Sequence, residues 1–163
     1  MAFIPRFCLR CITSLAVESP VVLHEAHLVV GSVIELGCGS GVLADAIASR
    51  GLRVVGVDMN QPKINQASLR YPNVTFIRSD ILELNLVDQR FDTVVLAEVL
   101  EHLQEDIGWQ VLEKAWSLVS DRGRFVISVP NQDCVPHPNH LCEFDARSLR
   151  KLLTPFGRAE IIS

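Results

Sequence analysis

Short apolar runs alternate along the chain with segments in which apolar residues recur every three or four positions. The runs are rich in β-branched and aromatic residues, as buried strands are; they span 33–36, 52–57, 74–77, 91–97 and 124–129, and another begins at 159. The periodic segments predict helices over 42–51, 63–70, 105–119 and 146–153. This alternation predicts an α/β domain with a doubly wound, mostly parallel sheet and helices on both faces.

We expect this Rossmann-like architecture over residues 31–163, because no linker-like tract or internal repeat interrupts them. Residues 1–30 lack the alternation and are predicted to form an N-terminal extension, within which 21–29 fits a short helix. Arg6 and Arg10 precede the first acid, Glu18, which faintly resembles an organelle transit peptide, but an ordinary tail is favoured. In sheets of this kind, ligands bind beyond the carboxyl ends of the strands.

The composition is that of an ordinary folded domain, with 48% hydrophobic and 21% charged residues. No apolar stretch approaches the ~20 residues of a membrane-spanning helix, so we expect no membrane association. The net charge of −4 argues against DNA, disfavours RNA and favours a small neutral or cationic ligand. An odd set of five cysteines without a signal peptide indicates reduced thiols and a cytoplasmic location.

Three alternate glycines, Gly37, Gly39 and Gly41, lie between the first of these strands and its helix. Glycine permits a positive φ there and lets a ligand approach the backbone, while the helix N-terminus offers free N–H groups. One interpretation is a dinucleotide-binding loop, because 39–44 fits G-x-G-x-x-A. That pattern leaves Gly37 and Glu35 unexplained, and 163 residues leave no room for a separate substrate domain. An NAD-linked oxidoreductase is therefore the weaker alternative.

The segment Glu35-Leu36-Gly37-Cys38-Gly39-Ser40-Gly41 resembles the first motif of class I S-adenosylmethionine-dependent methyltransferases. Later motifs of that family are matched by Asp58, by Ser79-Asp80-Ile81 and by Glu98-Val99-Leu100-Glu101-His102. The resemblance covers about residues 31–163 and is to the broad group that includes ubiquinone-biosynthesis-type and many small-molecule enzymes. It implies S-adenosylmethionine as cofactor and direct methyl transfer to a small-molecule acceptor.

The resemblance also implies a role for each matched residue. The three glycines would pack under the methionine part of the cofactor, and Glu35 would reach its ammonium group. Asp58 would accept hydrogen bonds from both ribose hydroxyls, as acids do in dinucleotide folds. Asp80 would meet the adenine amino group, with Ile81 beside the ring. We expect the side chain of Cys38 to be a small packing group rather than a nucleophile. The predicted cofactor-binding set is Glu35, Gly37, Cys38, Gly39, Gly41, Asp58, Met59, Asp80 and Ile81.

Methyl transfer from a sulfonium requires mainly alignment of the acceptor, and a general base only where the acceptor loses a proton. The predicted catalytic residues are Glu98, His102 and His140, although a histidine at a helix start, such as His102, is more often a packing or capping residue than a base.

No metal site is predicted, but two alternatives involve one. Glu98, Glu101, His102 and His140 resemble the metal-binding set of small-RNA 2′-O-methyltransferases. Cys8-x-x-Cys11 could bind zinc together with two residues from the set Cys134, His137, His140 and Cys142.

The resemblance departs from the family at the C-terminus. There the family places a seventh strand antiparallel between its fifth and sixth strands, and this sequence stops at Ser163, so we expect the last strand to be missing. Its absence would leave the strand at 124–129 with an open edge, to which a second copy of the chain could pair. We therefore expect either a monomer or a homodimer. The main alternative function is therefore a truncated domain that binds the cofactor without catalysis.

Overall fold

The computed structural model describes residues 6–11, 29–130 and 139–162, and the side chains of 29–130 and 139–157 among them. The strands are β1 (Arg6–Cys11), β2 (Ser32–Leu36), β3 (Arg53–Asp58), β4 (Thr75–Arg78), β5 (Phe91–Ala97), β6 (Val119–Val129) and β7 (Arg158–Ile162). The α-helices are α2 (Val42–Ala48), α3 (Gln61–Arg70), α4 (Glu105–Ser117) and α5 (Ala146–Leu153), and two 3₁₀ turns are η1 (Leu100–His102) and η2 (Thr154–Phe156). The predicted alternation of strands and helices is confirmed.

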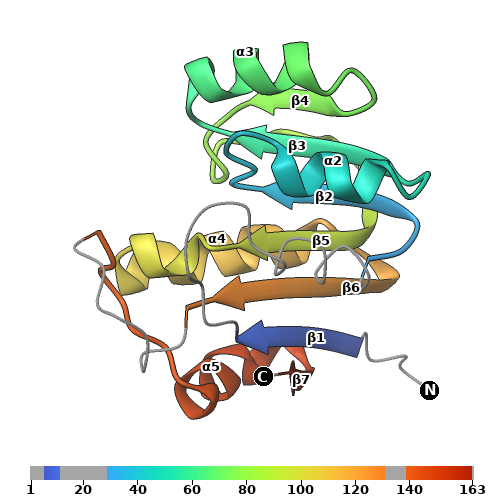
Figure 1. Ribbon diagram of the computed structural model, residues 1–163. Helices are drawn as coiled ribbons and strands as arrows, with labels where there is room; N and C mark the ends of the chain where they lie inside the picture. The colour runs from blue at the N-terminus through green and yellow to red at the C-terminus, as the bar shows by residue number, and fades with distance from the viewer. Residues whose placement is uncertain (1–5, 12–28, 131–138, 163) are drawn as a thin grey trace.

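The seven strands form one sheet in the order β4-β3-β2-β5-β6-β1-β7, and every paired strand in it is parallel (Figure 1). The chain proceeds outward from β2 to β3 and β4, then crosses to β5 and β6 on the other side of β2. The carboxyl ends of β2 and β5 therefore flank the point at which the winding reverses, where a doubly wound sheet leaves a crevice for ligands.

Helices cover both faces of the sheet, as the alternation of strands and helices predicted (Figure 1). Neighbouring residues of β2 show this, because Val33 packs in the cluster with α2 while Ile34 packs in the cluster with α4 and α5. Both side chains are completely buried. None of the helices that the structure describes is long and apolar enough to cross a membrane.

Strand β1 was not expected, since the sequence predicted only an extension over residues 1–30. It pairs in parallel with β6, where Cys8 lies opposite Val126, and with β7, where Cys8 lies opposite Glu160. The expectation of an open edge beside 124–129 is therefore wrong, because β1 occupies that edge of β6. The helix predicted over 21–29 lies outside the described residues except for Val29, which is buried and in no regular element.

A polar contact joins the starts of β2 and β5. The carboxylate of Asp92 accepts hydrogen bonds from the backbone N–H of Ser32 at 2.8 Å and from its hydroxyl at 2.9 Å. These two bonds hold the pKa of Asp92 below its ordinary value. Because the folded-state pKa is lowered, the contribution to stability is present above the unfolded pKa of about 3.9 and is lost as the pH falls through the folded value.

We expect Asp92→Asn to lower the free energy of unfolding at pH 7 by about 0.5–1 kcal/mol, a modest amount because the carboxylate is exposed to solvent. Urea denaturation at pH 7 and at pH 3 measures the effect, and the difference in stability between the two proteins should be smaller at the lower pH. Asp121→Asn removes the same charge from an exposed position in β6 and is the control. A deficit in Asp92→Asn that is equally large at pH 3 would contradict this account.

Candidate functional site

A cavity of about 450 Å³ lies at the carboxyl ends of the strands on both sides of the reversal point. It is lined by most of the residues singled out in the sequence. From the predicted cofactor-binding set these are Gly37, Gly39, Asp58, Met59, Asp80 and Ile81, and from the predicted catalytic set Glu98 and His102. Residues more than 60 positions apart along the chain thus come together at one site because parallel strands end at a common edge.

The glycine loop begins this cavity. Gly37, Gly39 and Gly41 have φ angles of 79°, 54° and 79°, in the left-handed region that favours glycine. The N–H groups of Gly37 and Cys38 both donate to the carbonyl oxygen of Val57, at 2.8 and 2.9 Å. The loop is therefore bound to the end of β3 before α2 begins.

The three glycines meet different surroundings. A Cβ on Gly37 would lie 2.5 Å from Cγ2 of Val99, and one on Gly41 would lie 2.6 Å from the ring of Phe76. A Cβ on Gly39 would have nothing within 4 Å. Gly37 and Gly41 are thus required for close packing, whereas Gly39 borders open space in the cavity.

Asp58 is the last residue of β3, and its carboxylate joins the glycine loop to the turn that follows β3. Its Oδ2 accepts the N–H of Gly39 at 2.8 Å, and its Oδ1 accepts the N–H of Asn60 at 2.8 Å. The carboxylate is half-buried and lines the cavity, so it has both a role in holding the loop and a surface toward a ligand. Asp80, after β4, is exposed and accepts the N–H of Leu82 at 2.8 Å.

Three members of the predicted cofactor set do not line the cavity. Glu35, the second-to-last residue of β2, is only 4% exposed. Gly41 is covered by the ring of Phe76. The thiol of Cys38 is 6% exposed and packs beside Gly56. Burial, together with the charges of Glu35 and Asp58, raises the pKa of this thiol. Cys38 is therefore a packing residue and not an activated nucleophile.

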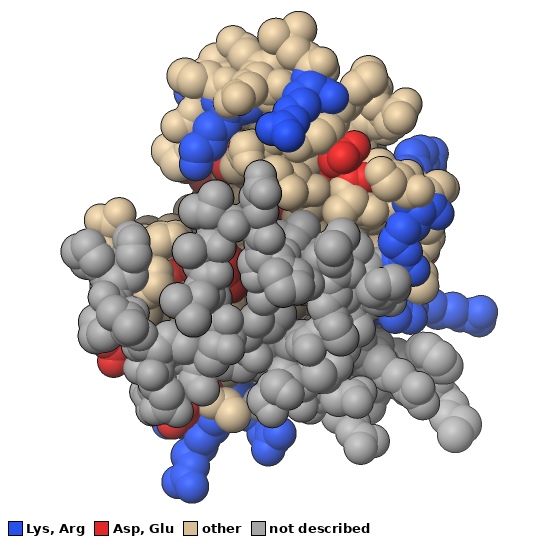
Figure 2. All heavy atoms as spheres, in the orientation of Figure 1, with Lys and Arg blue, Asp and Glu red and all other residues tan. Residues whose placement is uncertain are grey.

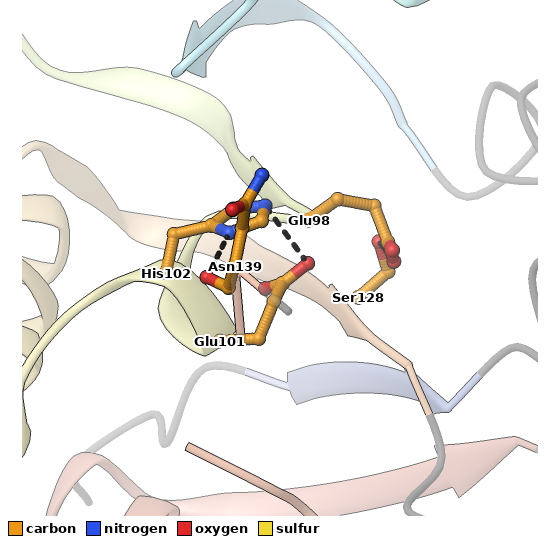
Figure 3. A network of polar contacts seen from close by, with 5 residues as sticks. All are labelled: Glu98, Glu101, His102, Ser128 and Asn139. Atoms are coloured by element: carbon orange, nitrogen blue, oxygen red, sulfur yellow. Dashed lines mark hydrogen bonds and ion pairs between the residues drawn. The ribbon is translucent and has the colours of Figure 1, made fainter. Parts of the chain in front are cut away.

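Glu98, directly after β5, has an unusual backbone conformation. Its φ is 53°, which few non-glycine residues adopt and which is often found at functional sites. Its N–H donates to the carbonyl of Ser128 at 3.1 Å, and the Ser128 hydroxyl donates to its Oε1 at 3.1 Å (Figure 3). Burial and the neighbouring Glu101 raise the pKa of Glu98 to about 7.

The turn η1 brings a second acid and a histidine next to Glu98 (Figure 3). Glu101 is 1% exposed, and burial raises its pKa to about 7. Nε2 of His102 lies 3.8 Å from Oε1 of Glu101, and its Nδ1 lies 3.0 Å from the backbone oxygen of Asn139. The ring of His140 meets that of His102 edge-on, with centroids 5.2 Å apart. Of the predicted catalytic residues, His102 thus contacts His140 and lines the same cavity as Glu98, whereas His140 does not line that cavity.

Some residues at the site are absent from the sets predicted from the sequence. Lys63 and Val99 line the cavity, and Asn139 binds His102. The position of Lys63 could have been found from the sequence, because it lies in the first turn of the helix that follows Asp58. Glu101 is within the motif at 98–102, but nothing in the sequence indicates that this acid, between Leu100 and His102, is buried. Nothing in the sequence indicates that the Asn139 backbone meets His102.

The sequence is similar to known proteins over most of its length. Residues 33–123 match a family model described as a methyltransferase domain. A probable S-adenosylmethionine-dependent methyltransferase of Mycolicibacterium smegmatis is 34% identical over 140 residues, which make up 81% of this chain and 54% of that protein. A ubiquinone biosynthesis O-methyltransferase of Coxiella burnetii is 30% identical over 121 residues, 72% of this chain and 49% of that protein.

Solved structures share the fold. Magnesium protoporphyrin IX methyltransferase from Synechocystis, crystallised with SAH, has a TM-score of 0.66 at 21% identity, over 83% of this chain and 68% of that one. This chain spans about half the length of the curated relatives that it matches.

The different surroundings of Gly41 and Gly39 predict different losses of stability when each is replaced by alanine. Gly41→Ala should lower the free energy of unfolding by about 2–4 kcal/mol, because a positive φ and a clash with Phe76 act together. Gly39→Ala should cost only about 1 kcal/mol, since its Cβ enters open space and only the backbone is strained. Urea denaturation of both variants measures the difference. Equal losses would mean that the loop is not packed against Phe76 as described.

Proposed function

The chain belongs to the family of methyltransferase domains, and from this premise we propose that it transfers a methyl group from S-adenosylmethionine to a small-molecule acceptor. The observation that carries the proposal is the cavity between Gly39 and Glu98, which joins a backbone cradle to a set of ionisable side chains. The same set also supports a cofactor-binding domain without catalysis, which the experiments below distinguish.

The residues at the cavity fit this cofactor in their chemistry. Gly39 has open space where a Cβ would stand, so a ligand can lie directly on the backbone. Asp58 offers carboxylate oxygens to hydroxyl donors such as those of a ribose, and Asp80 with Ile81 borders the far end, where an adenine could bind. Glu35, buried under the loop, supplies a negative charge near the position proposed for an ammonium group.

When bound, S-adenosylmethionine supplies an activated methyl group on a sulfonium, so the protein needs mainly to align the acceptor. Among the predicted catalytic residues, Glu98 is the best placed to accept a proton from it. Glu98 lines the cavity, and the Ser128 hydroxyl orients its carboxyl group. Both ring nitrogens of His102 already face other groups, which supports a positioning role for His102 and for the adjacent His140.

The space next to the cofactor cavity suits a small acceptor. A second cavity of about 450 Å³ shares Leu103 with the first and is lined by both apolar residues, such as Trp109 and Phe144, and charged ones, such as Glu105 and Lys151. On the face in Figure 2, the basic side chains of the described residues lie in several separate groups, which gives no support to a nucleic-acid acceptor. A small organic substrate, in the cytoplasm as the cysteine composition indicates, is the form of the proposal that we favour.

Cofactor binding is the first test of the proposed function. Calorimetric titration with S-adenosylhomocysteine should give micromolar binding, while NAD should not bind. Asp58→Asn should weaken binding roughly 10- to 150-fold, the equivalent of one charge-assisted hydrogen bond, about 1.5–3 kcal/mol. Gly39→Ala should weaken it as well while the protein stays folded, because the methyl group projects into the cavity. Asp121→Asn, far from the cavity, should bind as the unaltered protein does. A folded sample that binds NAD in preference, or neither ligand, would overturn the proposal.

The second prediction concerns turnover. We expect release of S-adenosylhomocysteine from S-adenosylmethionine with at least one member of a panel of small phenols, amines and carboxylic acids. Glu98→Gln, which keeps the shape of the side chain, should lower kcat about 100-fold or more with a hydroxyl acceptor and leave S-adenosylhomocysteine binding within threefold. Cofactor binding without turnover across the panel would favour the inactive-domain alternative. Full turnover by Glu98→Gln would refute the assignment of Glu98 as the base.

A further inference from the structure

Glu101, His102 and His140 form a group of potential metal ligands beside the cofactor cavity. One carboxylate oxygen and one nitrogen from each ring all lie within 4.8 Å of one another. Ligand atoms about 2.0–2.2 Å from a common zinc ion lie roughly 3–4 Å apart. The limit of 4.8 Å is wider than that spacing, and His102, whose side chain is 44% exposed, is the least buried of the three residues.

The orientation of His102 is that of a metal-binding histidine. Its Nδ1 lies 3.0 Å from the carbonyl oxygen of Asn139, and because a carbonyl oxygen only accepts, Nδ1 must carry the proton. In the neutral ring Nε2 then presents a lone pair toward Oε1 of Glu101, 3.8 Å away. Two electron-rich atoms that face each other are stabilised by a cation between them. A histidine that donates its other N–H to a backbone carbonyl is the usual arrangement at metal sites.

The environment of Glu101 is a second, independent observation. The side chain is 1% exposed, and its buried Oε2 accepts no hydrogen bond from the part of the chain that the structure describes. The other carboxylate oxygen, Oε1, faces His102. A buried carboxylate oxygen without a donor is costly, and a bound metal ion would offset that cost. The backbone of the same residue anchors the segment that carries His140, because its carbonyl accepts the N–H groups of Leu141 and Cys142 at 2.6 and 3.2 Å. The ligand group is thus held together before any ion arrives.

We propose that Glu101, His102 and His140 bind one divalent transition-metal ion such as Zn²⁺. Two imidazoles and one carboxylate suit zinc and its neighbours, whereas Mg²⁺ and Ca²⁺ prefer oxygen ligands. This revises the expectation of no metal. A set of three protein ligands leaves a coordination position open, and His102 also lines the cofactor cavity. If the proposed function holds, an oxygen of the acceptor can occupy that position and be held near the methyl group.

The test is a metal titration of the chelator-treated protein. Zn²⁺ should bind with one-to-one stoichiometry and micromolar or tighter affinity by calorimetry, and Co²⁺ should give visible absorption bands of a nitrogen- and oxygen-ligated ion. His140→Gln and Glu101→Gln should each weaken Zn²⁺ binding at least 10-fold. Glu143→Gln, which removes an exposed charge from the same segment, should bind as before. His140→Gln is the principal variant, because Glu101 is buried and its replacement can affect folding.

Several results would overturn the metal site. These are no binding of Zn²⁺ or Co²⁺ to the folded protein, undiminished binding in His140→Gln, or the near-ultraviolet band of a cobalt thiolate, which would assign the ion to cysteines. S-adenosylhomocysteine binding, measured on the same samples without metal, separates this proposal from the proposed function. Retained S-adenosylhomocysteine binding with no metal binding would refute the metal site alone, and the reverse result would refute the proposed cofactor alone.

Discussion

The attachment of the glycine loop to the carbonyl of Val57 is the contact on which the site depends. Leu36 lies opposite Val57 in the register of β2 and β3, so the chain leaves β2 at the level where β3 is about to end. Two consecutive N–H groups then reach the same oxygen, and Asp58 accepts the next available one, from Gly39. This geometry requires positive φ angles, and side chains from elsewhere, Val99 and Phe76, pack into the space that missing Cβ atoms leave. The glycines are therefore steric requirements as much as conformational ones.

Local patterns were enough to predict most of the fold. The strand at 91–97 and the helix at 146–153 have the predicted bounds, because a near-continuous apolar run defines the strand and an Asp145 cap defines the start of the helix. The helix predicted from 63 begins at 61, since Asn60 caps it and proline is accepted in its first turn. Strand β6 begins at 119 rather than 124, because Val119 pairs with Phe91 before an irregularity in the register, after which Arg124 pairs with Thr93. Strand β1 could not be predicted, since its pairing depends on partners over 100 residues away.

The sequence predicts those site residues that directly follow a strand. It does not predict residues whose role depends on burial or on contacts with distant parts of the chain. Asp58, Asp80 and Glu98 follow strands directly, so their common location follows from the topology. The double role of Asp58 depends on the path of a loop some 20 residues earlier, and periodicity does not describe that path. Glu101 has the appearance of a surface acid, yet the segment at 139–142 folds over η1 and buries it. A pattern of polar and apolar residues specifies a face but not what later covers it.

The two sides of the reversal point have different tasks, and the sheet fixes the distance between them. β2, β3 and β4 provide the backbone cradle and the acids proposed for the cofactor, while β5, β6 and the segments after them provide Glu98, Ser128 and the histidines. Direct pairing of β2 with β5 joins the halves, so their separation is set by backbone hydrogen bonds and not by flexible side chains. In-line transfer needs such a fixed distance, because small displacements reduce the rate strongly. The turns after β5 and β6 can then differ in sequence, and with them the acceptor, while the cofactor side keeps its geometry.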